Sequence, residues 1–230
     1  MFRPVVFLPG LLCDATLWRA QVEALSDIAA PFVADLTLDE TVRAMAERTL
    51  AAAPPNFSLV ALSMGGYVAF EMMRQAPGRI NRLALLSTSA APDDAGRAEA
   101  RQQGMAAVQV GRFLGMTSRL LPQFIHARHV DGPVGDTVRS MTERVGGEVF
   151  LRQQKAILGR PDSRPLLRKI QVPTLVAVGD ADQLTPPAEA RAIADGIAGT
   201  QFTIMDSCGH LPPLEKPDEV SALLRAWLTH

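Results

Sequence analysis

Hydrophobic positions along the chain alternate between short continuous runs and longer stretches with helical spacing. Continuous runs predict buried strands, because a strand covered on both faces of a sheet carries apolar side chains at successive positions. Six runs have this character: residues 4–8, 32–35, 58–62, 82–86, 174–178 and 202–205. Spacings of three and four predict helices near residues 15–26, 40–53, 65–75, 187–196 and 217–228. This alternation predicts an α/β fold with a mainly parallel sheet of about six strands and helices on both faces.

The stretch from residue 91 to residue 168 breaks the alternation. It contains no strand pattern, and Gly, Pro and Arg recur between helical segments at residues 94–103, 134–145 and 148–158. We expect a helical cap inserted into a core domain formed by residues 1–90 and 169–230. Residues 91–170 carry 13 Lys and Arg against 8 Asp and Glu, a balance of +5, while the rest has 10 against 16, a balance of −6. The basic excess is consistent with attraction of an anionic substrate and equally with a solvated surface.

Composition and overall charge exclude several classes of protein. The 230 residues are 47% hydrophobic and carry a net charge of −1, without the basic excess of nucleic-acid-binding proteins. No apolar stretch approaches the roughly 18 residues of a membrane span, and no signal-peptide cleavage site follows the first apolar run. Two cysteines and four histidines match no disulfide framework or zinc spacing. We expect a cytoplasmic protein with no cofactor, metal, nucleic acid or membrane partner; its oligomeric state is not readable.

A candidate nucleophile follows the third predicted strand. Ser63 lies between Ala61 and Gly65, and helical spacing begins directly after it. A serine on a sharp strand-to-helix turn needs small residues two positions before and after it, because the turn brings those backbones close to their neighbours. The alternative is that Ser63 is an ordinary helix N-cap.

Candidate acid and base residues follow the last two predicted strands. The fifth strand leads into Asp180 and Asp182, and the sixth leads into His210. Because the carboxyl ends of parallel strands meet at one edge of a sheet, these loops should lie near Ser63. A serine hydroxyl becomes nucleophilic when a base, oriented by a third group, takes its proton. Either aspartate has a plainer interpretation as a turn residue.

With these motifs in order, the chain resembles the α/β-hydrolase fold family over essentially its whole length. Ala61 to Gly65 resembles the nucleophile elbow, with Ala61 in place of the usual glycine. Gly179 and Asp182 resemble the Gly-x-x-Asp acid turn, which favours Asp182 over the other aspartate there. His210 lies in a Gly-His loop like that of the family. The N-terminal hairpin and the Gly-x-Gly loop of larger members are absent, so the resemblance implies a compact member.

The resemblance also implies an oxyanion hole formed by the backbone N–H groups of Leu11 and Met64. Pro9-Gly10-Leu11 resembles the family's His-Gly-x turn, with Pro9 in place of the usual histidine. Backbone donors at such positions stabilise negative charge that develops on a carbonyl oxygen. The plainer interpretation of Pro9-Gly10 is a turn after a strand.

The activity that the resemblance implies is that of a serine carboxylesterase acting on a small-molecule ester without a cofactor. Ser63 would attack the carbonyl carbon, His210 would transfer the proton, and Asp182 would fix the imidazole tautomer. The same triad serves thioesters, lactones, C–C bonds, perhydrolysis and acyl transfer, and the fold does not choose among them. A binding protein that uses the pocket as a receptor is the alternative outside enzymes, and Pro9 is the feature that favours it.

Several other residues have both a chemical and a plainer interpretation. Cys13 and Cys208 fall in loops near the predicted site, but neither occupies the elbow, and a lone loop cysteine is usually an apolar filler. His126, His129 and His230 are expected to be surface or capping residues. Five apolar residues are candidates either for an acyl pocket or for the core: Trp18, Met64, Met105, Met116 and Met141.

Overall fold

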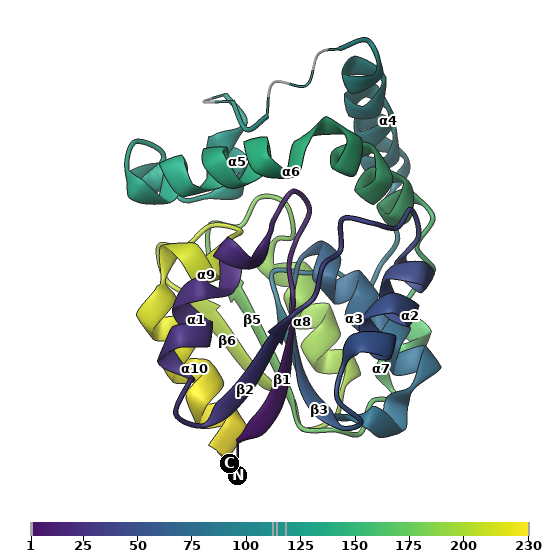
Figure 1. Ribbon diagram of the computed structural model, residues 1–230, viewed down its shortest axis with the longest axis vertical. Coiled ribbons are helices and arrows are strands. Elements are labelled where there is room, and N and C mark those ends of the chain that lie inside the picture. The colour runs from purple at the N-terminus through teal and green to yellow at the C-terminus, as the bar shows by residue number, and fades with distance from the viewer. Residues whose placement is uncertain (1, 112, 114, 118, 230) are drawn as a thin grey trace.

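A six-stranded sheet forms the centre of the protein in a computed structural model that describes residues 2–111, 113, 115–117 and 119–229 (Figure 1). All neighbouring strands are parallel, in the order β2-β1-β3-β4-β5-β6. The strands are β1 (Arg3–Leu8), β2 (Ala29–Val33), β3 (Phe57–Leu62), β4 (Ile80–Leu86), β5 (Thr174–Gly179) and β6 (Gln201–Met205). The predicted α/β fold with a parallel six-stranded sheet is confirmed.

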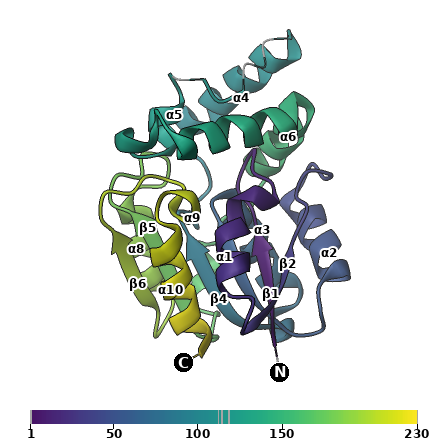
Figure 2. The same cartoon turned by 60° about the vertical axis from the view of Figure 1, so that its left-hand side comes forward.

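Helices cover both faces of the sheet (Figures 1 and 2). One face is packed by α2 (Val42–Ala52), α3 (Met64–Gln75), α7 (Arg164–Leu167) and α8 (Pro187–Gly196). The other is packed by the 3₁₀ turn η1 (Ala15–Trp18), α1 (Arg19–Ala24) and α10 (Pro217–Thr229), with α9 (Pro212–Glu215) beside them. Alternate strand residues enter the two cores, as Val6 and Leu8 do on one side and Val5 and Phe7 on the other. Apolar residues at successive positions are therefore what this sheet requires.

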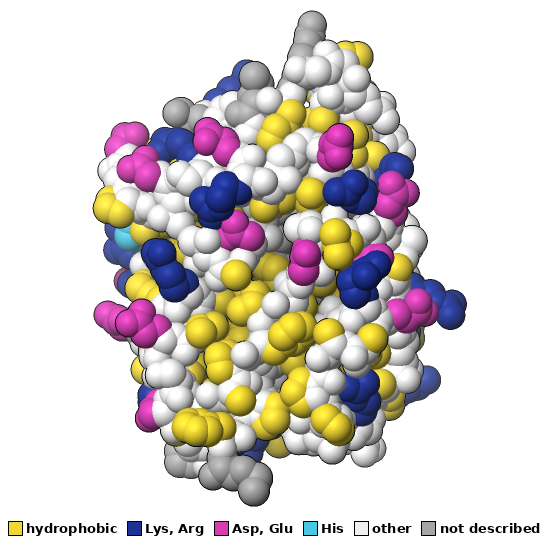
Figure 3. All heavy atoms as spheres, viewed as in Figure 1, with side chains coloured by type: hydrophobic (Ala, Val, Ile, Leu, Met, Phe, Trp, Pro, Cys, Tyr) yellow, Lys and Arg dark blue, Asp and Glu magenta, His cyan; other side chains and the backbone are white. Residues whose placement is uncertain are grey.

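Strand β2 lies at the edge of the sheet, and its predicted position was wrong by about three residues at its start. Pro31 in its middle conceals it, because proline is depleted in strands. Ala34 donates its N–H to the Phe7 carbonyl (2.9 Å), so alternate residues face β1, and Pro31 faces away from it. A proline is tolerated there because it interrupts no ladder hydrogen bond. Figure 3 shows hydrophobic side chains gathered over this edge, where Pro31 offers no N–H to a further strand.

Residues 91–168 contain no strand among their described residues, and their helices other than α7 lie over the carboxyl end of the sheet (Figures 1 and 2). Their elements are α4 (Ala95–Gln109), α5 (Leu121–Phe124), the 3₁₀ turn η3 (Ala127–His129), α6 (Pro133–Leu158) and α7. Gly146 interrupts α6 with φ 80° and ψ 174°, which explains why the sequence predicts two helices. We refer to residues 91–168 as the cap segment. No helix among the described residues combines the length and the apolar character needed to cross a membrane.

Part of the basic excess of the cap segment pairs with acidic residues beneath it. Arg144 binds Asp14 (2.9 Å), and Lys155 binds Glu40 (2.9 Å). All four side chains keep substantial contact with water, so each pair is worth only about 0–1 kcal/mol. The opposite charges of the cap segment and the core thus favour their association. The sequence analysis considered only substrate attraction and a solvated surface for the basic excess, and did not include this role.

The start of α3 approaches β1 so closely that only glycine fits. A Cβ atom on Gly65 would lie 2.5 Å from the Leu8 carbonyl oxygen and 2.8 Å from that of Pro9. One on Gly66 would collide with Thr88. Ser63, between β3 and α3, has φ 53° and ψ −116°, a conformation that a residue with a side chain rarely adopts. The strained turn and the close helix packing therefore form one arrangement.

We expect Gly65→Ala to destabilise the protein at or above the upper end of the about 1–3 kcal/mol typical of overpacking, because immobile backbone oxygens stand in the way. This exceeds the gain of about 1 kcal/mol from replacing glycine by alanine in a helix. Urea denaturation measures the difference. Gly78→Ala is the control, since its new methyl group meets nothing within 4 Å, and it should change stability by no more than about 0.5 kcal/mol. Equal stability of the two variants would contradict the steric argument.

Candidate active site

Three loops at the carboxyl edge of the sheet bring Ser63, His210 and Asp182 into one chain of hydrogen bonds. Ser63 follows β3, Asp182 follows β5, and His210 follows β6. The Ser63 hydroxyl lies 2.8 Å from His210 Nε2, and His210 Nδ1 lies 2.9 Å from each Asp182 carboxylate oxygen. His210 and Asp182 are buried, and Ser63 is half-buried. The structure thus brings together all three residues that the sequence pointed to, in the geometry of a nucleophile, a base and an orienting acid.

Local donors hold the Asp182 carboxylate in place. Leu184 and Thr185 donate their backbone N–H groups to one oxygen (2.9 and 3.0 Å), and the Thr185 hydroxyl donates to the other (2.9 Å). Burial alone would raise the pKa of Asp182, but the imidazole of His210 and the hydrogen bonds from Thr185 outweigh it and lower the pKa below the usual value. Asp182 is therefore ionised at neutral pH, as a group that stabilises an imidazolium must be.

Asp180, the rival acid of the same turn, has a different set of partners. Its carboxylate accepts the backbone N–H of Cys208 (2.9 Å), and the next residue, Ala181, donates its N–H to the Cys208 carbonyl (2.9 Å). The hydrogen bond from Cys208 is the main cause that lowers the pKa of Asp180. Asp180 thus joins the loop after β5 to the loop after β6, and it makes no described hydrogen bond with His210.

Two backbone N–H groups close to the candidate nucleophile are the oxyanion donors that the sequence predicts. Neither Leu11 nor Met64 donates its N–H to a protein acceptor in any described hydrogen bond outside regular helices and strands, whereas the N–H of Leu12 is taken by Gln153 Oε1 (2.9 Å). Gly10 passes beside the serine, since a Cβ atom on it would lie 3.5 Å from Ser63 Cβ. The role of Leu11 and Met64 as oxyanion donors stays a prediction.

Two buried residues that join the cap segment to these loops were missed by the sequence analysis. Gln153 of α6, besides accepting from Leu12, donates to the Leu36 carbonyl (3.1 Å). Glu215 accepts the N–H groups of His126 (2.8 Å), Gly209 (2.9 Å) and Leu211 (3.0 Å). A glutamate at the end of the apolar run Leu-Pro-Pro-Leu was the one available signal for Glu215. No local pattern marks Gln153.

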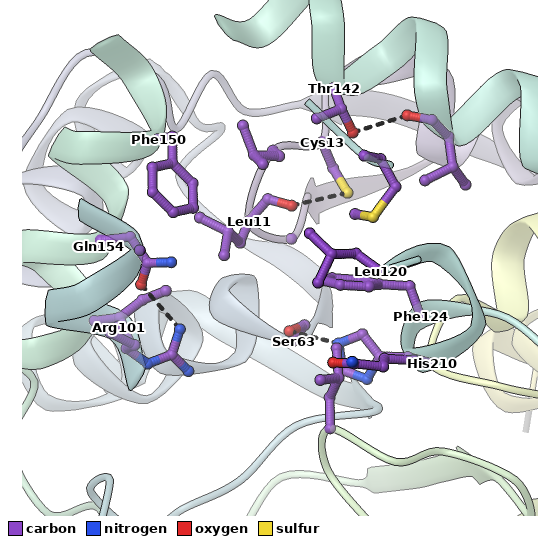
Figure 4. A pocket seen from close by; sticks show the side chains of 18 of the residues that line it. Leu11, Cys13, Ser63, Arg101, Leu120, Phe124, Thr142, Phe150, Gln154 and His210 are labelled. Carbon is purple, nitrogen blue, oxygen red and sulfur yellow. Dashed lines mark hydrogen bonds between the residues drawn. The ribbon is translucent and has the colours of Figure 1, made fainter. Parts of the chain in front are cut away.

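Ser63 and His210 open into a cavity of about 810 Å³ that lies between the core loops and the cap segment (Figure 4). Two of the candidate pocket residues, Met116 and Met141, line it. Trp18 and Met64 are instead buried in the two hydrophobic cores, and Met105 is not among the lining residues. The cavity walls are mostly apolar, as expected of a site for an organic ligand.

The remaining cysteines and histidines take minor places. Both cysteines are buried, and burial raises the pKa of the Cys13 thiol to about 12 and that of Cys208 further. His126 caps η3 by accepting the N–H of Arg128 (3.3 Å). His129 is half-buried and accepts from the Arg128 side chain, while His230 lies outside the described residues.

Across the described part of the chain, no group of three His, Cys, Asp or Glu residues could hold a metal ion.

Comparison with known proteins agrees with this geometry. Residues 5–223 match the sequence profile of the Alpha/beta hydrolase family. The chain belongs to this family. Among solved structures, an esterase from Thermogutta terrifontis, described with malate bound, is 30% identical to this alpha/beta hydrolase, with a TM-score of 0.89. The match covers 99% of this chain and 89% of that one.

Two further relatives are similar to this alpha/beta hydrolase over most of its length. The enol-lactonase from Burkholderia xenovorans has a TM-score of 0.90 at 23% identity, covers 100% of this chain and 92% of its own, and supports the fold alone. A pimeloyl-[acyl-carrier protein] methyl ester esterase from Neisseria meningitidis is 26% identical over 193 residues, which are 80% of this chain and 74% of that protein. The esterases among these relatives are named for ester cleavage.

We expect both thiols of this alpha/beta hydrolase to be inert in the folded state. A pKa of about 12 leaves only about one Cys13 thiol in 10⁴ ionised at pH 8, and the thiolate is the reactive form. Iodoacetamide at pH 8, followed by mass spectrometry, should leave the folded protein unmodified and label two sites in urea. Rapid labelling of either cysteine in the folded protein would reopen the possibility of a cysteine nucleophile.

Proposed function

We propose that the protein is a serine hydrolase that cleaves a carboxylic ester through an acyl-enzyme intermediate. The observation that carries this proposal is the hydrogen-bonded chain from Ser63 through His210 to Asp182, which opens directly into the cavity. The esterase names of the similar proteins support the same class of reaction.

In the first half-reaction, Ser63 Oγ attacks the ester carbonyl carbon while His210 Nε2 takes the hydroxyl proton. The bond to the alcohol then breaks, and His210 returns the proton to the departing oxygen. In the second half-reaction, His210 takes a proton from water, which attacks the carbonyl carbon of the acyl-Ser63 ester. His210 then returns the proton to Ser63 Oγ as the bond to the acyl group breaks and the acid leaves. Asp182 holds the Nδ1–H tautomer and stabilises the imidazolium that forms in each step.

The N–H groups of Leu11 and Met64 are proposed to bind the carbonyl oxygen as it becomes negative. Loss of one such donor costs about 10²–10³ in kcat in serine hydrolases of comparable design. The position of Met64 at the first turn of α3 adds the favourable field of a helix N-terminus. Pro9 precedes this turn without occupying either donor position, so its presence does not favour a receptor over an enzyme.

We also propose that the cap segment, residues 91–168, acts as an inserted domain on a core formed by residues 1–90 and 169–230. It contributes many of the cavity walls and none of the three triad residues. Its role would be to exclude water from the acyl-enzyme and to select the acyl chain.

Labelling with a fluorophosphonate should modify Ser63 and abolish turnover of a panel of esters and thioesters. Ser63→Ala should take up no label and lose activity on every member of the panel, because the covalent route is closed. Peptide mapping by mass spectrometry locates the label. A folded Ser63→Ala variant that retains turnover would overturn the proposed function, and an unlabelled, inactive wild-type protein would favour a receptor.

Asp182→Asn should lower kcat by about 10⁴, the size seen when the acid that sets the histidine tautomer is lost. Asp180→Asn is the matched control, since it changes the same atoms two residues away and makes no described contact with His210. Its effect on kcat should be much smaller, with any loss appearing in thermal stability. The reverse ranking in two folded variants would move the acid role to Asp180.

A further inference from the structure

The cavity has a polar end formed by helices of the cap segment. Arg101 of α4 and Gln154 of α6 both line it, and Arg101 Nη1 donates to Gln154 Oε1 (2.9 Å). In the view of Figure 4 this pair lies to one side of Ser63, with Phe124 and His210 on the other. Most of the cavity lining is apolar, so these polar groups stand out in the substrate space.

Several hydrogen-bond donors at this end have no acceptor among the described residues. Arg101 uses Nε on Asp93 and Nη1 on Gln154, which leaves Nη2 without a partner among the described residues. The Gln154 amide nitrogen and the Tyr67 hydroxyl likewise make no described hydrogen bond. None of these atoms is among the fully enclosed ones that lack a partner, so each keeps some exposed surface, and all three residues line the cavity. Burial raises the pKa of Tyr67, and its phenol keeps its proton and can donate.

The same end carries one positive charge more than its carboxylates balance. The Asp93 carboxylate forms ion pairs with both Arg101 (Nε, 2.6 Å) and Arg160 (Nη2, 2.8 Å), so one carboxylate faces two guanidinium groups. The Asp93 and Arg160 side chains are only 5% and 4% exposed, which limits screening by water. An uncompensated charge in such a place is costly, and an anionic ligand would relieve that cost.

The neighbouring carboxylates of Glu189 and Asp94 lie on Arg97, and neither forms an ion pair with Arg101 or Arg160. Arg97 also lines the cavity, but it is paired with Glu189 (2.5 Å) and contributes no net charge. Asp94 lies 4.0 Å from Arg97, and its side chain is largely exposed to water. No Asp or Glu is among the residues described as lining the cavity.

We propose that this protein acts on esters that carry a free carboxylate in addition to the scissile ester, with the carboxylate bound by Arg101 and Gln154. The inference rests on the proposed function of Ser63 and adds the chemical class of its substrate. A carboxylate accepts from Arg101 Nη2 and the Gln154 amide together, and such charge-assisted hydrogen bonds are stronger than neutral ones. Apolar side chains such as Leu11 and Phe150 lie on the cavity wall, where methylene groups can pack.

The test compares esters with and without the extra carboxylate. Monomethyl esters of straight-chain dicarboxylic acids, in graded lengths, are measured against the corresponding dimethyl esters, which places the charge on the acyl side. Acetate esters of ω-hydroxy acids, measured against their methyl esters, place it on the alcohol side. In one of these two series, at one chain length, we expect the ester with the carboxylate to have a kcat/KM about 10- to 100-fold higher than its uncharged counterpart. This factor is the range of a hydrogen bond to a charged group.

Arg101→Gln should reduce this carboxylate preference by the same factor, mainly through KM. Arg139→Gln is the control, because it removes one positive charge from the same cap segment, where Arg139 pairs with Asp136 away from the cavity. It should keep the wild-type preference. Fluorophosphonate labelling of Ser63 and thermal denaturation check that Arg101→Gln is folded. If Arg101→Gln does not fold, an inhibition experiment on the wild-type protein takes its place. Hydrolysis of a neutral ester is measured in the presence of dicarboxylates or of monocarboxylates of equal length, and the dicarboxylates should inhibit more strongly.

The outcomes separate the two proposals. Hydrolysis of neutral esters with no gain from a carboxylate at any length or on either side overturns this inference and leaves the function of Ser63 intact. An equal loss of preference in Arg101→Gln and Arg139→Gln also overturns it, because the effect would then be general attraction to the basic cap segment. Activity that survives Ser63→Ala overturns the proposed function of Ser63, on which this inference rests.

Discussion

The arrangement of the active site depends on the contact of α3 with β1 at Gly65. Backbone oxygens of Leu8 and Pro9 occupy the space that a side chain would need. This approach sets the start of α3 directly after β3 and leaves Ser63 in a backbone conformation with positive φ. The hydroxyl is thereby presented above the sheet edge, where the loops after β5 and β6 can reach it. The cost of the strained residue is offset by packing in the core beneath, in which Val68 and Phe70 of α3 are fully buried.

The cap segment is joined to the core by two kinds of interaction with different consequences. Exposed ion pairs such as Arg144 with Asp14 follow from the opposite charges of the two segments and contribute little individually. Hydrogen bonds to the buried side chains of Gln153 and Glu215, which accept the N–H groups of Leu12 and His126, are stronger in effect, because breaking either would take a partner from a buried polar group. The first bond lies one residue from Leu11. Glu215, the acceptor of the second, also accepts the N–H groups of the two residues that flank His210.

The sequence predicted the sheet and the positions of Ser63, Asp182 and His210 because their signals are local. Apolar runs mark buried strands, and each of these residues lies in the loop after one. The start of β2 was mistaken because Pro31 hides an edge strand whose pairing is visible only in three dimensions. Gln153 could not be found, since it meets Leu12 across 141 positions of the chain and neither residue is chemically distinctive. The same holds for the cavity wall, where Met116 and Met141 could not be told from core methionines such as Met64.

The hydrogen bond from the Leu12 N–H to Gln153 ties the cap segment to the loop that also carries Leu11, one of the two proposed oxyanion donors. The N–H of Leu12 is held by Gln153, whereas the N–H of the preceding residue, Leu11, has no described acceptor in the protein. A cap transplanted from another protein would alter turnover as well as substrate range unless it supplied an acceptor at this point. Divergence of the cap is thus constrained at one buried glutamine while the residues around it are free to change.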